Sequence, residues 1–185
     1  MANSDAPFGF RPINRDGSPY NGATTKGYFL ATDTTAAFIG DVVKHDLTSL
    51  NGVPQVTQAA AGDDAYGVIV GFDVDPDDLG AQYRKASTLR YCKLASCDGT
   101  FFEAQDGATL GVASSNLNVN FAVAAGNTTY GTSGMEIGTS AATTATLDLM
   151  LIAPVDREDN DGTAANAKWV VKFNVSQTRP ERTGA

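Results

Sequence analysis

The chain has 185 residues, which is enough for one domain with a hydrophobic core. Its formal net charge is −8, from 13 basic and 21 acidic residues, so we expect it to repel nucleic-acid phosphates and to have no nucleic-acid partner. Glycine is abundant and charged residues make up only 18% of the chain, a composition that favours short strands and turns over helices.

Neither end of the sequence carries a pattern typical of export or membrane insertion. No basic segment followed by an apolar run opens the chain, and no apolar stretch reaches the roughly 18 residues that a membrane-spanning helix needs. We therefore expect no membrane partner and synthesis in a cytoplasm.

Residues 1–25 have the composition of an extended N-terminal arm. Pro7, Pro12 and Pro19 each fix the backbone angle φ and remove a hydrogen-bond donor. Phe8 and Phe10 are nevertheless large apolar groups that a disordered tail seldom carries. Two interpretations follow: the segment folds back on its own domain, or it docks on a partner or a neighbouring protomer. The second predicts that deleting residues 1–20 leaves the domain folded.

Residues 26–177 are predicted to form one β-rich domain, followed by a C-terminal tail at 178–185. The Asn51-Gly52 pair predicts a hairpin turn, and Pro54 after it favours an edge strand. A bend or bulge is expected at Gly67 or Gly71. Short strands are predicted at 27–31, 41–45, 46–50, 53–57, 65–74, 89–95, 100–104, 119–124 and 135–137, with a short helix or loop at 108–118.

Two segments near the C-terminus alternate apolar and polar side chains with a period of two, which predicts strands with one buried face. The expected inward residues are Ala145, Leu147, Leu149, Leu151 and Ala153, then Trp169, Val171, Phe173 and Val175. Thr146, Asp148, Lys168, Lys172 and Asn174 are expected to face solvent. The link at 154–167 is acidic and is predicted to be a loop.

Met150 and Ile152 break the alternation, because both are apolar and lie on the face expected to be wet. Such residues need a second layer, a barrel closure or a neighbouring subunit to cover them. We therefore include both among the candidate contacts with a partner or a neighbouring protomer.

Candidate catalytic and metal-binding groups are few. His45 is the only histidine, and no Gly-x-Ser-x-Gly motif is present, so a hydrolase would have to use His45 with nearby carboxylates. Cys92 and Cys97 do not have the spacing of a zinc pair, and we expect buried free thiols. We expect no enzyme activity and no cofactor.

The acidic loops at 73–78 and 156–161 supply carboxylates of the kind that calcium-binding loops use. Asp73, Asp75 and Asp77 have the first three spacings of an EF-hand, but Asp78 and Arg84 stand where its glycine and glutamate belong. Solvated loops are the expected outcome, and no metal site is predicted.

Several stretches together resemble the capsid cement, or decoration, proteins of tailed bacteriophages. They are APFGFRP at 6–12, GAT at 22–24, FIGDVV at 38–43, YGVIVGF at 66–72, REDN at 157–160 and NAKWVVK at 166–172, in order over nearly the whole chain. The region 108–130 is where the sequence departs from the group.

The resemblance implies a mainly β fold, a compact β-tulip or β-barrel-like domain, and a place on the outer surface of the expanded head in the virion. It implies that the major capsid protein and the chain itself are the partners, with a homotrimer expected first and a dimer second. It carries over no catalytic residue. The candidate contacts are Pro7, Phe8, Phe10, Arg11, Pro12, Met150 and Ile152. The alternative is a soluble β-barrel module that binds a ligand or acts as an adhesin.

Overall fold

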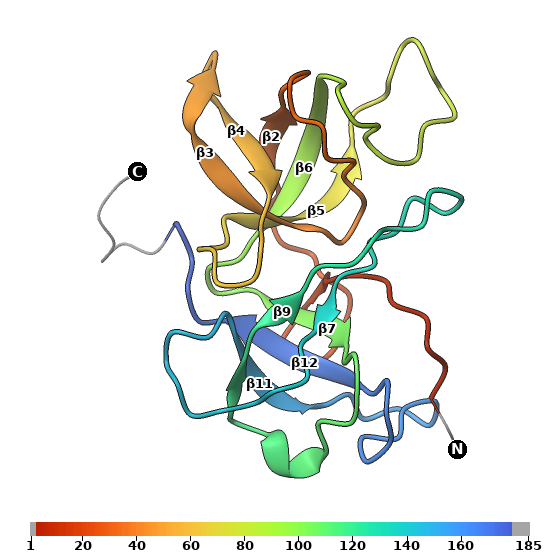
Figure 1. Cartoon of the computed structure of the whole chain (residues 1–185), viewed down its shortest axis with the longest axis vertical. Helices are drawn as coiled ribbons and strands as arrows, with labels where there is room; N and C mark the ends of the chain where they lie inside the picture. Colours follow the sequence, from red (N-terminus) through yellow and green to blue (C-terminus); the bar gives the residue numbers. More distant parts are fainter. Residues whose placement is uncertain (1–2, 179–185) are drawn as a thin grey trace.

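A computed structural model describes residues 3–178, which fold into two β lobes (Figure 1). The predicted mainly β fold is confirmed, including a closed barrel. The strands are β1 (Arg11–Ile13), β2 (Thr25–Phe29), β3 (Val42–Leu50), β4 (Val53–Gln58), β5 (Gly67–Phe72), β6 (Arg90–Ser96), β7 (Phe101–Gln105), β8 (Asn118–Val119), β9 (Phe121–Ala122), β10 (Glu136–Ile137), β11 (Leu149–Pro154) and β12 (Lys168–Phe173), with a 3-10 turn at Val112–Ser114.

The upper lobe in Figure 1 is a closed barrel with the strand order β2-β4-β3-β5-β6. The hairpin predicted from Asn51-Gly52 joins β3 to β4, and both residues have the positive φ that this turn requires. The expected edge position of Pro54 is wrong, because β4 lies between β2 and β3 and a closed barrel has no edge. A register shift between Ile69 and Gly71 confirms a bulge next to Gly71.

The lower lobe is a five-stranded sheet with the order β1-β7-β12-β11-β8, next to the short β9–β10 pair. Its central strands β11 and β12 are the predicted antiparallel pair, and Leu149, Leu151 and Trp169 are buried as expected. The prediction is wrong before Leu149, because Ala145 lies outside β11 and is exposed, and it is wrong again beyond Leu151. Ile152 is an extra residue in a bulge, so Ala153 turns to the exposed face.

Asp148 is a second correction in this region, because it was expected to face solvent and is only 2% exposed. Its carboxylate accepts hydrogen bonds from the backbone N–H groups of Gly62 (3.1 Å) and Phe121 (3.2 Å). Burial raises the pKa of this carboxyl, and the two N–H donors oppose the rise. The side chain thus joins the loop after β4 to the sheet lobe.

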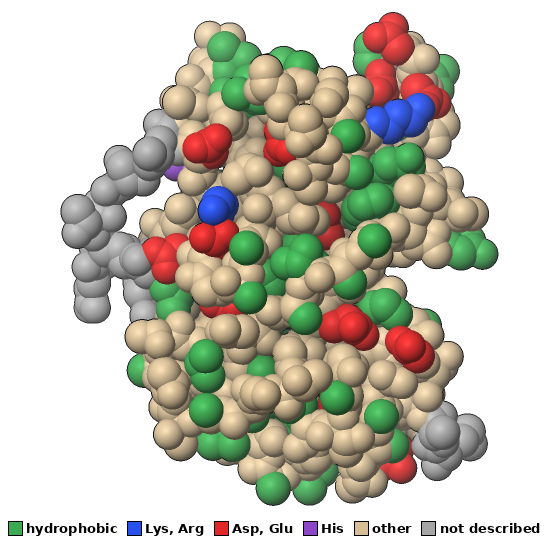
Figure 2. Space-filling view, viewed as in Figure 1, with side chains coloured by type: hydrophobic (Ala, Val, Ile, Leu, Met, Phe, Trp, Pro, Cys, Tyr) green, Lys and Arg blue, Asp and Glu red, His purple; other side chains and the backbone are tan. Residues whose placement is uncertain are grey.

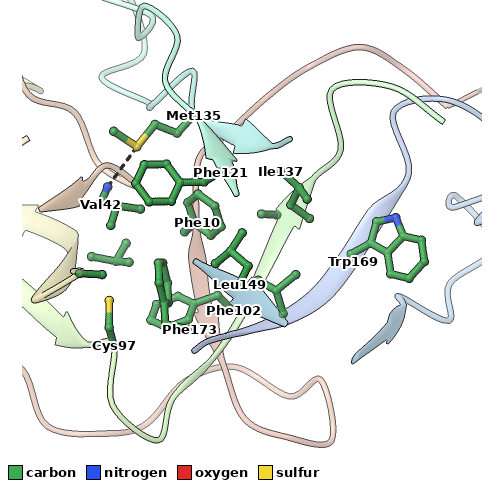
Figure 3. Packing of buried hydrophobic residues seen from close by; sticks show 14 of the residues in the cluster. Phe10, Val42, Cys97, Phe102, Phe121, Met135, Ile137, Leu149, Trp169 and Phe173 are labelled. Atoms are coloured by element: carbon green, nitrogen blue, oxygen red, sulfur yellow. Dashed lines mark hydrogen bonds between the residues drawn. The ribbon is translucent and has the colours of Figure 1, made fainter. Parts of the chain in front are cut away.

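The two lobes share one hydrophobic core, although the molecule is indented between them on the side shown in Figure 2. Val42 and Cys97 from the barrel region pack with Phe102 and Phe173 from the sheet (Figure 3). Met135 lies at the junction, and its sulfur accepts a hydrogen bond from the Val42 N–H at 3.2 Å. A smaller cluster fills the barrel itself and consists of Phe29, Ala37, Val43, Val56, Ile69, Cys92 and Leu94.

The N-terminal segment folds back on its own chain, the first of the two interpretations. β1 pairs with β7, and Ile13 is 6% exposed. The Phe10 ring is 1% exposed and contacts Phe121 and Phe173, with ring centroids 6.2 and 5.6 Å away. Phe10 is therefore a core residue, and its prediction as a surface contact is wrong. Of the predicted tail at 178–185, residues 179–185 lie outside the described residues.

Candidate interaction site

Two glycines determine where the N-terminal segment crosses the barrel. The Phe10 N–H donates to the Gly40 carbonyl at 2.9 Å, and both Gly9 and Gly40 have positive φ. A Cβ on Gly9 would lie 2.5 Å from the Gly40 oxygen, and one on Gly40 would lie 2.6 Å from the Phe8 oxygen. Only glycine fits at both positions, so the two backbones touch and the segment has a fixed place.

Beside this crossing lies a hollow of about 540 Å³, which we call the N-terminal hollow. Its walls come from segments that lie far apart in the sequence. They are the N-terminal segment, the loop before β3, strand β5 and the β7 side of the sheet. The lining residues are Phe8, Phe10, Arg11, Pro12, Ile13, Gly17, Pro19, Tyr20, Ile39, Gly40, Ile69, Val70, Glu103, Thr132 and Arg157. Most of these side chains are apolar, which is the usual character of a binding surface.

The outer rim of the N-terminal hollow carries an aromatic ring beside a cation. The Arg11 guanidinium lies over the half-buried Phe8 ring, with 4.8 Å between its central carbon and the ring centroid. Ile39 is 38% exposed on the facing loop. The rim therefore offers an apolar contact surface with one exposed positive charge.

A bidentate ion pair closes the other side of the N-terminal hollow. Arg157 donates to both carboxylate oxygens of Glu103, at 2.7 and 3.3 Å, and Glu103 is only 4% exposed. The Glu103 carboxylate raises the pKa of Arg157. Arg157 also contacts Asp159, whose other oxygen accepts from Lys168 at 2.7 Å. This network orders the acidic loop at 156–161, whose role the sequence did not indicate.

The first described residues are also attached to the sheet lobe. Asn3 donates to the carbonyls of Asp161 and Ala165, and its own side-chain oxygen accepts from the Asp161 N–H. Gln105 accepts from the Ala6 N–H and donates to the Ser4 carbonyl. Gln105 thus satisfies backbone groups of Ser4 and Ala6, while the Asn3 side chain satisfies backbone groups at 161–165, and together they give the segment a defined path.

The predicted contact residues do not form one surface. Phe8, Arg11 and Pro12 line the N-terminal hollow, together with the buried Phe10. Pro7 is half-buried just before them and is not among the lining residues. Met150 and Ile152 are half-buried on β11, away from the hollow's lining.

Most lining residues of the N-terminal hollow were not predicted from the sequence, among them Ile39, Glu103 and Arg157. Ile39 follows Phe38 in a link without a strand pattern, and Glu103 has the alternation of an ordinary strand residue. Arg157 did carry a signal, because it is a single cation within an acidic loop. Such a cation often has a specific carboxylate partner elsewhere in the fold.

The side chains considered as catalytic or metal-binding groups do not line the N-terminal hollow. His45 is half-buried, its ring lies 5.6 Å from the Tyr66 ring, and its backbone N–H donates to the Gln177 side-chain oxygen. Cys92 and Cys97 are buried free thiols, as predicted, and burial raises the pKa of Cys92 to about 12. A thiol with so high a pKa is a poor nucleophile at neutral pH.

Over residues 3–178 no group of three or more histidine, cysteine, aspartate or glutamate side chains is arranged to hold a metal ion. The carboxylates of the 73–78 loop have lysine neighbours instead, with Asp73 2.8 Å from Lys26 and Asp78 2.7 Å from Lys85. The same described residues contain no apolar helix of the length that spans a bilayer.

Asp41 is a buried carboxylate whose titration should affect stability. It is 1% exposed, and its Oδ2 accepts from the Phe38 N–H and from Gln58. Burial raises its pKa above the ordinary 3.8. Its contribution to stability is therefore fully present below pH 3.8 and is lost as the pH rises through the folded-state pKa.

Replacing Asp41 with asparagine keeps the acceptor oxygen and removes this titration. As the pH rises from 3.8 through the raised folded-state pKa of Asp41, the free energy of unfolding of the wild type is expected to fall relative to that of Asp41→Asn. Urea denaturation at several pH values measures the difference, and an unchanged m-value shows that the same structure unfolds. A difference that stays constant with pH would contradict the prediction.

Comparisons of the chain with protein-family models, with curated proteins and with solved structures found no match. The residues and geometry of the N-terminal hollow are therefore the observations that bear on function.

Proposed function

We propose that this chain is a virion structural protein, a capsid cement or decoration protein without enzyme activity. In this proposal it binds the outer surface of an expanded tailed-phage head and bridges neighbouring major capsid subunits, as a homotrimer. It does so through the rim of the N-terminal hollow, where Phe8, Arg11 and Ile39 meet solvent.

One observation carries the proposal. The segment at 6–12, which opens the resemblance to cement proteins, forms a wall of a solvent-facing apolar hollow and is fixed there by the Gly9–Gly40 crossing. A preformed surface loses little conformational entropy on binding, which suits a protein that must hold other subunits in place. The net charge of −8 further supports a partner that is protein rather than nucleic acid.

The energies fit an assembly in which several weak contacts act together. Burying one side chain the size of Phe8 contributes roughly 1.5–3 kcal/mol, which is too little for stable attachment by one protomer. Linked copies bind with an avidity that exceeds the single affinity by about 10²–10⁴-fold. The proposed homotrimer would supply such linkage, and light scattering of the purified protein measures its mass.

The test is binding of the purified protein to expanded heads that lack it. A Phe8→Ser, Ile39→Ser double variant is expected to keep its fold, because neither side chain belongs to the hydrophobic core clusters, and to bind about tenfold more weakly. Leu50→Ser is the control, because Leu50 is similarly exposed, at 40%, on the distant β3–β4 hairpin. Cryo-electron microscopy and sedimentation measure occupancy. Wild-type protein that fails to bind heads would overturn the proposal.

Deletion of residues 1–20 is not a suitable test, contrary to the expectation from sequence. The deletion removes β1 and the core residue Phe10, so it would destabilise the domain together with any docking surface. Point substitutions on the rim separate the two effects.

A second candidate function is ligand binding by a soluble β-barrel module. The volume of the N-terminal hollow, about 540 Å³, falls in the range of small-molecule sites. Native mass spectrometry of the purified protein distinguishes the candidates. A retained small molecule with no affinity for expanded heads would favour this second function.

A further inference from the structure

A second exposed surface lies on the loop between β5 and β6. Residues 73–82 of this loop, which we call the knob, project from the barrel lobe (Figure 1). The knob carries Val74, 76% exposed, and Leu79, 82% exposed. Two aliphatic side chains this exposed on one short projection are unusual unless a partner covers them.

Arg90 fixes both ends of the knob. Its guanidinium donates to the carbonyls of Asp73 (3.2 Å), Ala81 (2.9 Å) and Tyr83 (2.5 Å) while the residue is only 7% exposed. The planar guanidinium therefore binds backbone carbonyls on both sides of the loop at once. The single ammonium group of a lysine could not reproduce these contacts.

Arg84 attaches the base of the knob to the barrel. The residue is fully buried and donates to four backbone carbonyls, those of Thr88, Thr35, Leu30 and Asp33. The Arg84 guanidinium also lies over the Phe29 ring at 5.1 Å. The base of the loop is therefore built into the end of the barrel.

A neighbouring turn extends the same surface. Gly131 lies against Gln82, because a Cβ on Gly131 would come within 2.7 Å of the Gln82 carbonyl oxygen. Next to this contact, Tyr83 stacks on Phe38 with ring centroids 4.9 Å apart. Tyr130, 71% exposed, immediately precedes Gly131, so this residue lies next to the base of the knob.

These contacts distinguish the knob from a solvated flexible loop. Seven hydrogen bonds from two buried arginines hold its base, so its apolar side chains are presented from a scaffold that is already ordered. Binding through such a surface needs little further ordering, and exposed aliphatic and tyrosine side chains on it are suited to a partner's pockets.

The charge of the knob selects the partner. Asp73 and Asp78 have lysine neighbours, whereas Asp75 and Asp77 add further negative charge at the tip, where Figure 2 shows acidic side chains gathered. Carboxylates beside the exposed Val74 and Leu79 favour a partner surface that carries positive charge. We infer that the knob docks into an apolar depression rimmed by lysine or arginine on a protein. This inference rests on the proposed function, under which that protein is the major capsid subunit.

The test again uses expanded heads that lack the protein. A Val74→Ser, Leu79→Ser double variant is expected to fold normally by circular dichroism and to bind about tenfold more weakly. Val112→Ser is the matched control, because Val112 is 52% exposed on the 3-10 turn of the sheet lobe. An Asp75→Asn, Asp77→Asn variant is expected to show a weaker salt dependence of binding.

The outcomes separate this inference from the proposed function. If wild-type protein binds heads and the Val74, Leu79 variant binds equally well, the knob inference fails and the proposed function stands. If wild-type protein does not bind, both fail. If the double variant does not fold, Leu79→Ala alone replaces it, with the same expected direction.

Discussion

Replacing Phe10 with alanine is expected to lower the free energy of unfolding by about 3–5 kcal/mol. The ring is 1% exposed, sits between Phe121 and Phe173, and belongs to the core that joins the two lobes (Figure 3). The cavity left by alanine could close only if the backbone crossing at Gly40 moved. Chemical denaturation followed by tryptophan fluorescence measures the loss, because Trp169 is buried in the same core.

Phe8→Ala is the matched comparison, since it removes the same ring two residues earlier in the chain. Phe8 is half-buried on the rim of the N-terminal hollow, so its loss is expected to cost about 1 kcal/mol or less. Equal costs for the two variants would mean that the N-terminal segment does not contribute to the core as described.

Replacing Arg84 with lysine is expected to destabilise the protein by about 3 kcal/mol or more, although the charge is kept. An ammonium group cannot reach four separate carbonyls, so acceptors at Leu30, Asp33 and Thr88 would be left buried without their donor. Thermal and urea denaturation measure the loss, and amide hydrogen exchange is expected to rise in the loop at 30–35 and in the knob.

Arg11→Lys is the control for this substitution. Arg11 is exposed and its described contact is the face of the Phe8 ring, which lysine can also approach. Its stability is expected to stay within about 0.5 kcal/mol of the wild type. If Arg84→Lys were equally mild, the carbonyl contacts would not be what holds the base of the knob.

The strands were predictable because their information is local. Alternation placed Leu149, Leu151 and Trp169 on a buried face, and Asn51-Gly52 gave the hairpin, from residues that are neighbours in sequence. The 108–130 region was harder, because β8 and β9 are two residues long and too short to display a period.

The misplaced residues have tertiary causes. Ile152 occupies a bulge that only its pairing with β12 reveals, and Asp148 is buried because two backbone N–H groups from elsewhere in the chain need an acceptor. Phe10 looked like a docking group because proline-rich composition resembles a free arm. The N-terminal hollow could not be predicted, since its walls come from segments more than 100 residues apart.

The pairing of β1 with β7 also determines how late during synthesis the sheet lobe can finish folding. Ile13 faces Phe101 across this ladder, and β7 in turn pairs with β12 near the end of the chain. The ribosome therefore releases β1 long before its partners exist, whereas the barrel strands find theirs within a shorter span. We expect the barrel to acquire protease resistance first in stalled nascent chains. Phe10 would be protected only after Phe173 has emerged, so the first strand made is among the last to be secured.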